Sequence, residues 1–135
     1  MSLCVVLLFE RGTTAAQKPD AERPMPTGTE LLIDCNKAMR VIGGDTTLTD
    51  VEFVDASHCT GYVLGVVDGY VVTEAAEKSR MQFSTSLICF AKTGFMPTPQ
   101  VVGLVVKYLR DNPKHLGEPA ASLVLLAMQN AFPCK

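Results

Sequence analysis

The 135-residue chain contains no tryptophan, and aromatic residues make up only 7% of it. A folded core must therefore be built from valine, leucine, alanine and methionine, and a hydrophobic fraction of 47% is enough for one. Twelve basic and 14 acidic residues give a formal net charge of −2, without the basic stripe that binds nucleic acid. No apolar run approaches the roughly 20 residues that span a membrane. These absences favour one globular domain with neither a nucleic-acid partner nor a membrane span.

Residues that carry catalysis or bind metals are also scarce. The two histidines lie far apart, and although His58 precedes Cys59, adjacent helical residues point in different directions, which argues against a Cys–His catalytic pair. The acidic group Asp50, Glu52 and Asp55 lacks the glycine-turned loop of a calcium site. Solvated carboxylates at the start of a helix are the simpler interpretation. We therefore expect no enzyme activity, no metal and no cofactor.

The N-terminal residues resemble a signal peptide for export. Residues 3–9 form an apolar run, and the small residues 12–16 are typical of a signal-peptidase site. Glu10 and Arg11 interrupt the approach to this site, and the missing basic residues before the run would be explained by a start codon placed too far downstream. A buried strand or short helix is the alternative. We expect a signal peptide over residues 1–16 with cleavage near Ala16, a flexible mature N-terminus over residues 17–27, and the folded domain over residues 28–135.

Five cysteines are spread along the chain, and none forms the close Cys-x-x-Cys pair of zinc and redox sites. Cys4 lies in the predicted signal peptide, so the exported chain keeps an even number. Well-separated cysteines in an exported domain of this size indicate two disulfides, with reduced core cysteines as the alternative. The four remaining cysteines are Cys35, Cys59, Cys89 and Cys134.

Apolar residues at helical spacing predict four helices. The first opens with a capping box from Thr27 to Glu30, and the third opens with Thr98 as its N-cap and Pro99 at its first helical position. Residues 81–89 alternate in polarity, but a single candidate strand predicts no sheet. The sequence therefore predicts an all-α fold, a small helical bundle of about four helices with two disulfides. The first predicted helix spans residues 28–42, and the second begins near Asp55 or Ser57 and continues past Tyr70. The third runs from Thr98 to Asp111, and the fourth runs from Glu118 to Phe132.

The order of the helices suggests how the cysteines pair. A short connection joins the third and fourth helices, so we expect them to be antiparallel neighbours, with Cys89 before one helix close to Cys134 after the other. If the first two helices also pair, Cys35 lies near Cys59. We predict Cys35–Cys59 and Cys89–Cys134 bridges, each contributing on the order of 3–4 kcal/mol by restricting the unfolded chain.

Gly61, Gly65 and Gly69 recur at every fourth position of the second predicted helix. Glycine weakens a helix by about 1 kcal/mol relative to alanine, so three at this spacing call for a reason. Close approach of another backbone is the expected one, and the sequence does not separate a core contact from a dimer contact. A membrane-dimer motif is the sharper alternative, but the neighbouring charges of Asp55 and Asp68 argue against it.

Several motifs follow one another in a recognisable order. They are Leu31-Leu32-x-x-Cys35, Cys59-x-Gly61-Tyr62-x-x-Gly65, Cys89, the run from Val105 to Pro113, Pro119-Ala120-Ala121-Ser122-Leu123, and Ala131-Phe132-Pro133-Cys134. This pattern resembles the Rap/Tai family of type VI secretion immunity proteins over about residues 29 to 134. One departure is residues 90–94, where a proline is expected soon after the cysteine.

The resemblance implies a periplasmic, helical, disulfide-bonded protein, commonly a homodimer, that blocks a peptidoglycan amidase delivered by the type VI system. The amidase would be a papain-like cysteine peptidase that cuts the stem peptide, and a protruding loop of the immunity protein would occupy its cleft. Because a scaffold does not fix a partner, a small periplasmic helical chaperone or envelope stress protein is the alternative.

Two exposed segments are candidates for this effector-binding loop. The first leaves the second helix with charged residues and then a hydrophobic anchor, and the second lies between Cys89 and the start of the third helix. Arginine and large apolar side chains suit interface hot spots. We favour the first segment because it is longer and carries charge, and an ordinary solvated connection is the alternative for both. The candidate residues are Lys78, Ser79, Arg80 and Met81 in the first, and Phe95 and Met96 in the second.

Overall fold

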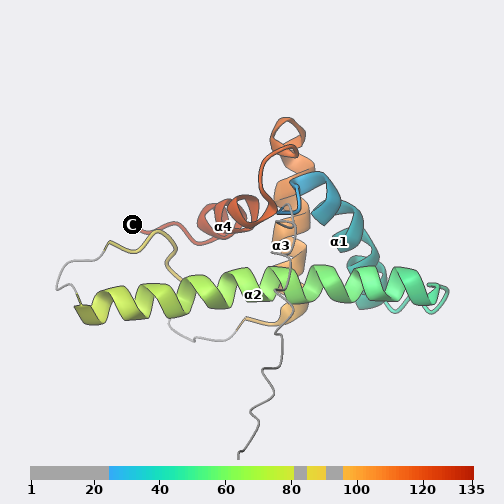
Figure 1. Cartoon of the computed structure of the whole chain (residues 1–135), viewed down its shortest axis with the longest axis horizontal. Helices are drawn as coiled ribbons and strands as arrows, with labels where there is room; N and C mark the ends of the chain where they lie inside the picture. The colour runs from blue at the N-terminus through green and yellow to red at the C-terminus, as the bar shows by residue number, and fades with distance from the viewer. Residues whose placement is uncertain (1–24, 81–84, 91–95) are drawn as a thin grey trace, which may run out of the picture.

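The computed structural model describes residues 25–80, 85–90 and 96–135, and these residues fold into four α-helices and one 3-10 turn (Figure 1). No strand occurs in the described residues, and residues 85–90, which include the end of the stretch of alternating polarity, lack regular structure. The all-α prediction with about four helices is confirmed. The predicted signal peptide, residues 1–16, lies outside the described residues. The elements are α1 (Gly28–Ile42), α2 (Asp50–Arg80), α3 (Thr98–Asp111), η1 (Pro113–His115) and α4 (Ala120–Ala131).

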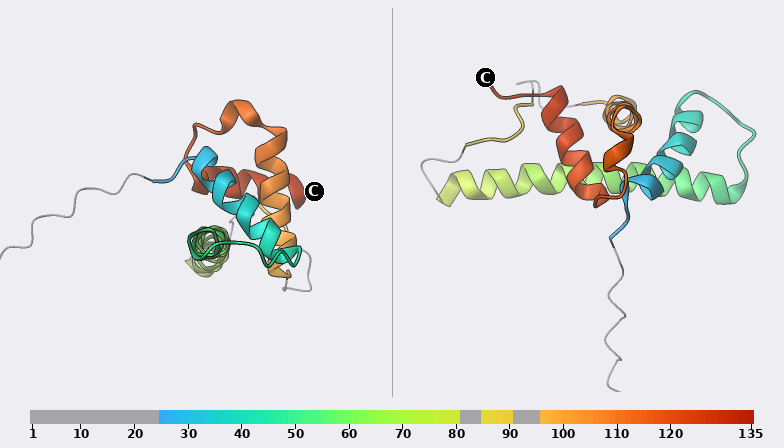
Figure 2. Two further views of the ribbon diagram at one scale, coloured as in Figure 1. Left: turned by 90° about the vertical axis from the view of Figure 1, so that its right-hand side faces the viewer. Right: turned by 90° about the horizontal axis from the view of Figure 1, so that it is seen from above.

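The 31-residue helix α2 runs the length of the molecule, and α1, α3 and α4 lie to one side of it (Figures 1 and 2). The core forms where the other three helices meet the N-terminal half of α2. Its members are Leu31, Cys35 and Ala38 of α1; Ala56, Cys59 and Val63 of α2; Ile88; Val101, Val102, Val105, Val106 and Leu109 of α3; and Ala120, Leu123, Val124, Ala127 and Met128 of α4.

Helix α1 begins and ends where the sequence predicts, because a capping box fixes its first turn and Gly43 caps its end. The Thr27 amide donates to Oε2 of Glu30 at 2.7 Å, and the Glu30 amide donates back to the Thr27 hydroxyl at 3.4 Å. The hydrogen bond from the Thr27 amide also lowers the pKa of Glu30. This reciprocal capping box satisfies two amides that would otherwise lack partners.

The start of α1 is joined to the start of α4 by backbone hydrogen bonds. The Gly28 amide donates to the Glu118 carbonyl at 3.0 Å, and the Ala120 amide donates to the Pro26 carbonyl at 2.8 Å. Gly28 is buried in this contact, and a Cβ atom there would lie 2.3 Å from Cδ1 of Leu123. The close approach of the two chain segments therefore requires glycine at position 28.

We expect the substitution Gly28→Ala to lower the free energy of unfolding by about 1–3 kcal/mol, as overpacking of a filled core does. The new methyl group would press on Leu123, which is fully buried, and on the backbone of Leu116 at 3.1–3.2 Å. Urea unfolding followed by circular dichroism measures the change. Gly117→Ala is the control, because a Cβ atom at Gly117 meets nothing within 4 Å. Equal stability of the two variants would contradict the packing argument.

Helix α2 begins earlier than predicted, at Asp50, so the predicted start near Asp55 or Ser57 is wrong. The cause is a second capping box: the Thr49 amide donates to Oε2 of Glu52 at 2.9 Å, and the Glu52 amide donates to the Thr49 hydroxyl at 3.3 Å. The Thr-x-x-Glu spacing was present in the sequence and marks this start. The acidic residues therefore belong to the helix itself, two of them in its first turn.

The starts of α3 and α4 differ from the predictions by one or two residues. Thr98 lies inside α3, and Pro97 occupies the N-cap position without a side-chain hydrogen bond. Helix α4 begins at Ala120 after Pro119, so its predicted start at Glu118 is two residues too early. The proline in each junction fixes an extended backbone before the helix, which shifts the boundary without changing the element.

Both predicted disulfides are present, with Cα–Cα distances of 5.1 Å for Cys35–Cys59 and 5.0 Å for Cys89–Cys134. The Cys89–Cys134 bridge was predicted from antiparallel third and fourth helices, and that arrangement is wrong. The right-hand view of Figure 2 looks nearly along α3 and shows α4 from the side, so the two helices cross steeply. The cysteines meet instead because residues 85–90 lie beside the end of α4, where the Cys89 amide donates to the Phe132 carbonyl at 2.9 Å.

Candidate functional site

The C-terminal turns of α2 project beyond the core (Figure 1). The last fully buried residue of α2 is Val63, the last partly buried one is Glu74, and every residue from 75 to 80 is exposed. This end of α2 is a helical projection from the folded body. It can present side chains to a partner without the entropy cost of ordering a loop.

Three of the predicted binding residues lie in the last turn of this projection. Lys78 and Arg80 are exposed, and Nζ of Lys78 lies 3.4 Å from Oε2 of Glu74. The Ser79 hydroxyl donates to the Ala76 carbonyl at 2.7 Å. The prediction that these residues have left the helix is wrong, since α2 continues to Arg80. The fourth residue of this segment, Met81, lies outside the described residues.

The segment after α2 is attached to the helix through Tyr70. The Tyr70 hydroxyl donates to Oε1 of Glu74 at 2.9 Å and accepts from the amides of Leu87 and Ile88, each at 3.1 Å. A hydrogen bond from Ser86, and further ones from Tyr70 and a lysine, lower the pKa of Glu74. The carboxylate therefore stays ionised at neutral pH and holds this junction together.

A disulfide and an aromatic contact fix the same segment from its other side. Phe90 lies between Tyr70 and Phe132, with ring-centroid distances of 6.5 and 5.5 Å. The neighbouring Cys89 is bonded to Cys134. Residues 85–90 therefore form a fixed point that divides the connection between α2 and α3 into two shorter parts.

We expect Tyr70→Phe to cost about 1–3 kcal/mol of stability, because it removes three hydrogen bonds at a partly buried hydroxyl and keeps the ring. Amide hydrogen exchange should accelerate at Leu87 and Ile88, whose amides lose their acceptor. Tyr108→Phe is the control, since the Tyr108 hydroxyl has no hydrogen-bond partner in the described part of the chain. Unchanged exchange at both amides would show that the hydroxyl does not hold the segment.

The second predicted segment lies elsewhere. Phe95 falls outside the described residues, whereas Met96 is partly buried and packs against the core. The end of α2 and the start of α3 lie well apart in Figure 1 and in the right-hand view of Figure 2. Lys78 and Arg80 therefore do not share a surface with Met96.

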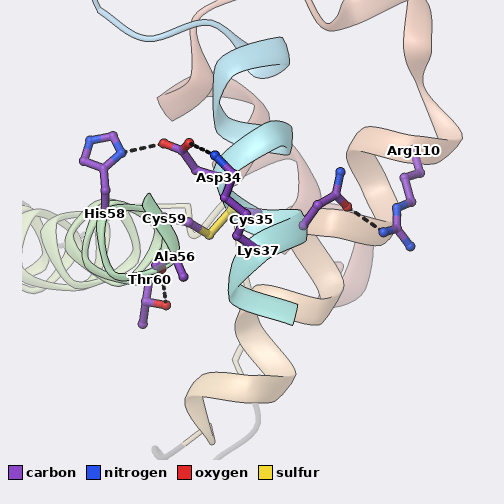
Figure 3. Close-up of a disulfide and its surroundings, with 9 residues drawn as sticks. Asp34, Cys35, Lys37, Ala56, His58, Cys59, Thr60 and Arg110 are labelled. Atoms are coloured by element: carbon purple, nitrogen blue, oxygen red, sulfur yellow. Dashed lines mark hydrogen bonds and ion pairs between the residues drawn. A yellow bond between two sulfur atoms is a disulfide. The ribbon is translucent and has the colours of Figure 1, made fainter. Parts of the chain in front are cut away.

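Ion pairs hold α1 against α2 around the buried Cys35–Cys59 bridge (Figure 3). Nζ of Lys37 lies 2.5 Å from Oδ2 of Asp55, and Nδ1 of His58 lies 2.8 Å from Oδ2 of Asp34. Since Cys59 is bonded to Cys35, it cannot act as a nucleophile beside His58. In the part of the chain that the structure describes, no group of three or more ligand side chains could hold a metal ion.

A feature that the sequence analysis missed lies where α1 ends and α2 begins. A shallow apolar hollow of about 240 Å³ opens there, and Phe53 on its rim is 56% exposed. Beside it, Arg40 forms ion pairs with Asp45 and Glu52 at 2.8 and 2.9 Å. Hydrogen bonds from Thr47, and then from Arg40, lower the pKa of Asp45 to about 2. The hollow is lined by Ala38, Val41, Ile42, Phe53, Ala56, Ser57 and Thr60.

Comparison with known proteins gives one finding about the whole domain. The family model described as Rap1a immunity proteins matches residues 27–134, which include all four helices and both disulfides. Neither the curated proteins nor the solved structures contain a match to this chain. Among the described residues, no helix is both long and apolar enough to cross a membrane.

Proposed function

Since this chain belongs to the family of Rap1a immunity proteins, we propose that it binds and blocks a peptidoglycan amidase effector of the type VI secretion system in the periplasm. The family match over residues 27–134 is the observation that carries the proposal. Two disulfides support the periplasmic location, because such bonds persist in oxidising compartments. The proposal includes export by the signal peptide over residues 1–16 and action as a homodimer.

The inhibitory contact that we propose is occlusion of the amidase active site by the end of α2 and the residues that follow it. Lys78 and Arg80 supply positive charge at the tip, and residues 85–90 are fixed to the body by Tyr70 and by a disulfide. A segment that is fixed on both sides can fill a cleft at a low entropy cost. A papain-like peptidase cleft that is filled in this way cannot admit the stem peptide.

The proposal is tested by expressing an amidase encoded beside this gene in the periplasm, with and without the chain. We expect the chain to bind the purified amidase and to prevent lysis. A variant lacking residues 1–16 is the control, because it should remain in the cytoplasm and give no protection. Intact-mass analysis of the exported protein should show a chain that starts after Ala16 and lacks Cys4. If the parent neither binds nor protects against any neighbouring amidase, the chaperone alternative gains, and acid-triggered protection of client proteins would support it.

A further inference from the structure

Leu87 is exposed to solvent although its backbone is attached to the folded body. Its side chain is 62% exposed, whereas the side chain of Ile88 is 3% exposed. Over residues 81–89, Leu87 belongs to the more apolar of the two alternating sets of side chains, the set that packs on the core in a half-buried segment. In the described part of this stretch, Ile88 from the other set takes the buried position. The apolar side chain of Leu87 is therefore held away from the core.

Contacts on both sides of Leu87 fix its backbone. The Tyr70 hydroxyl accepts from the amides of Leu87 and Ile88, each at 3.1 Å. The next residue, Cys89, is bonded to Cys134, and its amide donates to a carbonyl at the end of α4 at 2.9 Å. The chain bends at Leu87, between these attachments. A partner that buries this side chain therefore has little backbone to order, which keeps the entropy cost of binding low.

The other strongly exposed apolar side chains of α2 lack this combination. Single exposed apolar residues are common on proteins and need no explanation by themselves. Val54 and Val72 are 64% and 68% exposed, but they are shorter than leucine and lie on a regular helix. A Cβ atom at Gly61 or Gly65, between them, would meet nothing within 4 Å. The core contact considered for these glycines is therefore absent from the described residues, and the helix face between the two valines carries no projecting side chain at either glycine.

Leu87 lies close enough to the tip of α2 to contact the same partner. Its amide is bonded to Tyr70, and Lys78 follows Tyr70 by eight residues, which is about 12 Å along the helix. A standard interface covers about 800 Å² on each partner, which is roughly 30 Å across. One partner can therefore contact Leu87, Lys78 and Arg80 at the same time.

We propose that Leu87 is the apolar anchor of the inhibitory contact and fills an apolar pocket in the cleft of the amidase. Lys78 and Arg80 then face acidic side chains of the amidase, about 12–15 Å from that pocket. The partner surface is thereby specified as a pocket that admits a leucine, with negative charge to one side. Tyr70 is a positioning residue, because it holds the backbone that carries the anchor. This inference deepens the proposed function and rests on it.

Titration of the purified neighbouring amidase with the parent and its variants tests the anchor. We expect Leu87→Ala to weaken binding by roughly tenfold or more, mainly through faster dissociation, because most of the buried apolar area is lost. Leu87→Met should bind nearly as the parent does, since the two side chains are similar in volume. Ile33→Ala in α1 is the matched control, because Ile33 is another large aliphatic residue and is 52% exposed. Its affinity should equal that of the parent.

A double-mutant cycle tests whether Tyr70 acts through Leu87. Tyr70→Phe should weaken amidase binding in the parent, because the backbone of the anchor loosens. The same substitution should change the affinity much less in the Leu87→Ala background, where no anchor remains to be positioned. A tyrosine that only stabilises the fold would change the affinity equally in both backgrounds, and that result would remove Tyr70 from the proposal.

The outcomes separate the anchor from the immunity function. If the parent binds the amidase and Leu87→Ala binds it equally well, the anchor is overturned and the proposed function stands. A loss of affinity in Met81→Ala but not in Leu87→Ala would also overturn the anchor, in favour of the residue predicted from the sequence. If the parent binds no neighbouring amidase, the proposed function fails and the anchor fails with it.

Discussion

Replacing Cys35 and Cys59 together by alanine is expected to destabilise the domain more than replacing Cys89 and Cys134. The entropy of the unfolded chain alone gives the opposite order. A bridge across 24 residues restricts the unfolded chain by about 3.4 kcal/mol, and one across 45 residues restricts it by about 4.0 kcal/mol. The longer bridge would therefore contribute more by about 0.6 kcal/mol.

Packing reverses this order. Cys35 and Cys59 are 0% exposed and belong to the core, so alanine at both positions leaves a cavity that costs about 1–2 kcal/mol more. Cys89 and Cys134 are exposed and tie a segment outside the helices to the chain end. We therefore expect a loss of about 4–6 kcal/mol for the core pair, a large share of the roughly 5–15 kcal/mol typical of a folded domain.

Urea unfolding of the two double variants measures both losses under the same conditions. The exposed bridge should also be the first to open in a mild reductant, and mass spectrometry after thiol alkylation identifies which bridge has opened. Equal losses, or a larger loss for the Cys89 and Cys134 variant, would show that the unfolded chain and not core packing sets the order.

The parts of the fold that depend on residues close together in the sequence could be predicted from it. The start of α1 follows from its capping box, because Thr27 and Glu30 are three residues apart and bond to each other. The inner faces of α3 and α4 follow from apolar spacing, since Val105 and Leu123 lie in the core as expected. The Cys89–Cys134 bridge was predicted correctly from a wrong helix arrangement. The partner of a cysteine could therefore be predicted without the correct crossing angle of α3 and α4.

The length of α2 could not be predicted, because local preferences and tertiary contacts disagree there. Three glycines lower its helix propensity, and the mostly polar stretch from Asp45 to Glu52 is typical of a turn or a short helical piece. The helix nevertheless runs through Arg80, since Thr49 caps its start and its inner face packs on the core. Lys78 and Arg80 were therefore predicted in a connection but lie on a helix.

The attachment of residues 85–90 was also beyond sequence analysis. Tyr70 and Ile88 are 18 residues apart, and no local pattern shows that one hydroxyl accepts two amides from a later segment. The hollow beside Phe53 was missed for a similar reason, because it depends on how α1 and α2 cross. The residue types indicate which side chains can make contacts. Which of them come together depends on the three-dimensional arrangement of the helices.

Neutralising the tip of α2 should weaken amidase binding without unfolding the protein. We expect Lys78→Gln with Arg80→Gln to reduce affinity by about thirtyfold, the loss of one hot spot of about 2 kcal/mol. Both residues are exposed, and the contact of Lys78 with Glu74 is a surface pair worth about 0.3–0.5 kcal/mol. Urea unfolding should therefore show little change, and titration calorimetry with the neighbouring amidase measures the affinity.

The matched control for the α2 variant is Lys107→Gln with Arg110→Gln. This pair removes the same charge from exposed residues near the end of another helix, α3. If long-range attraction by the positive side chains drives binding wherever they lie on the protein, both variants lose affinity equally and mainly through slower association. If the tip of α2 enters the cleft, only the first variant loses affinity, and it does so through faster dissociation. A loss of affinity found only in Phe95→Ala with Met96→Ala would show that the segment before α3 enters the amidase cleft. Met96 would then contact the amidase as well as pack against the core.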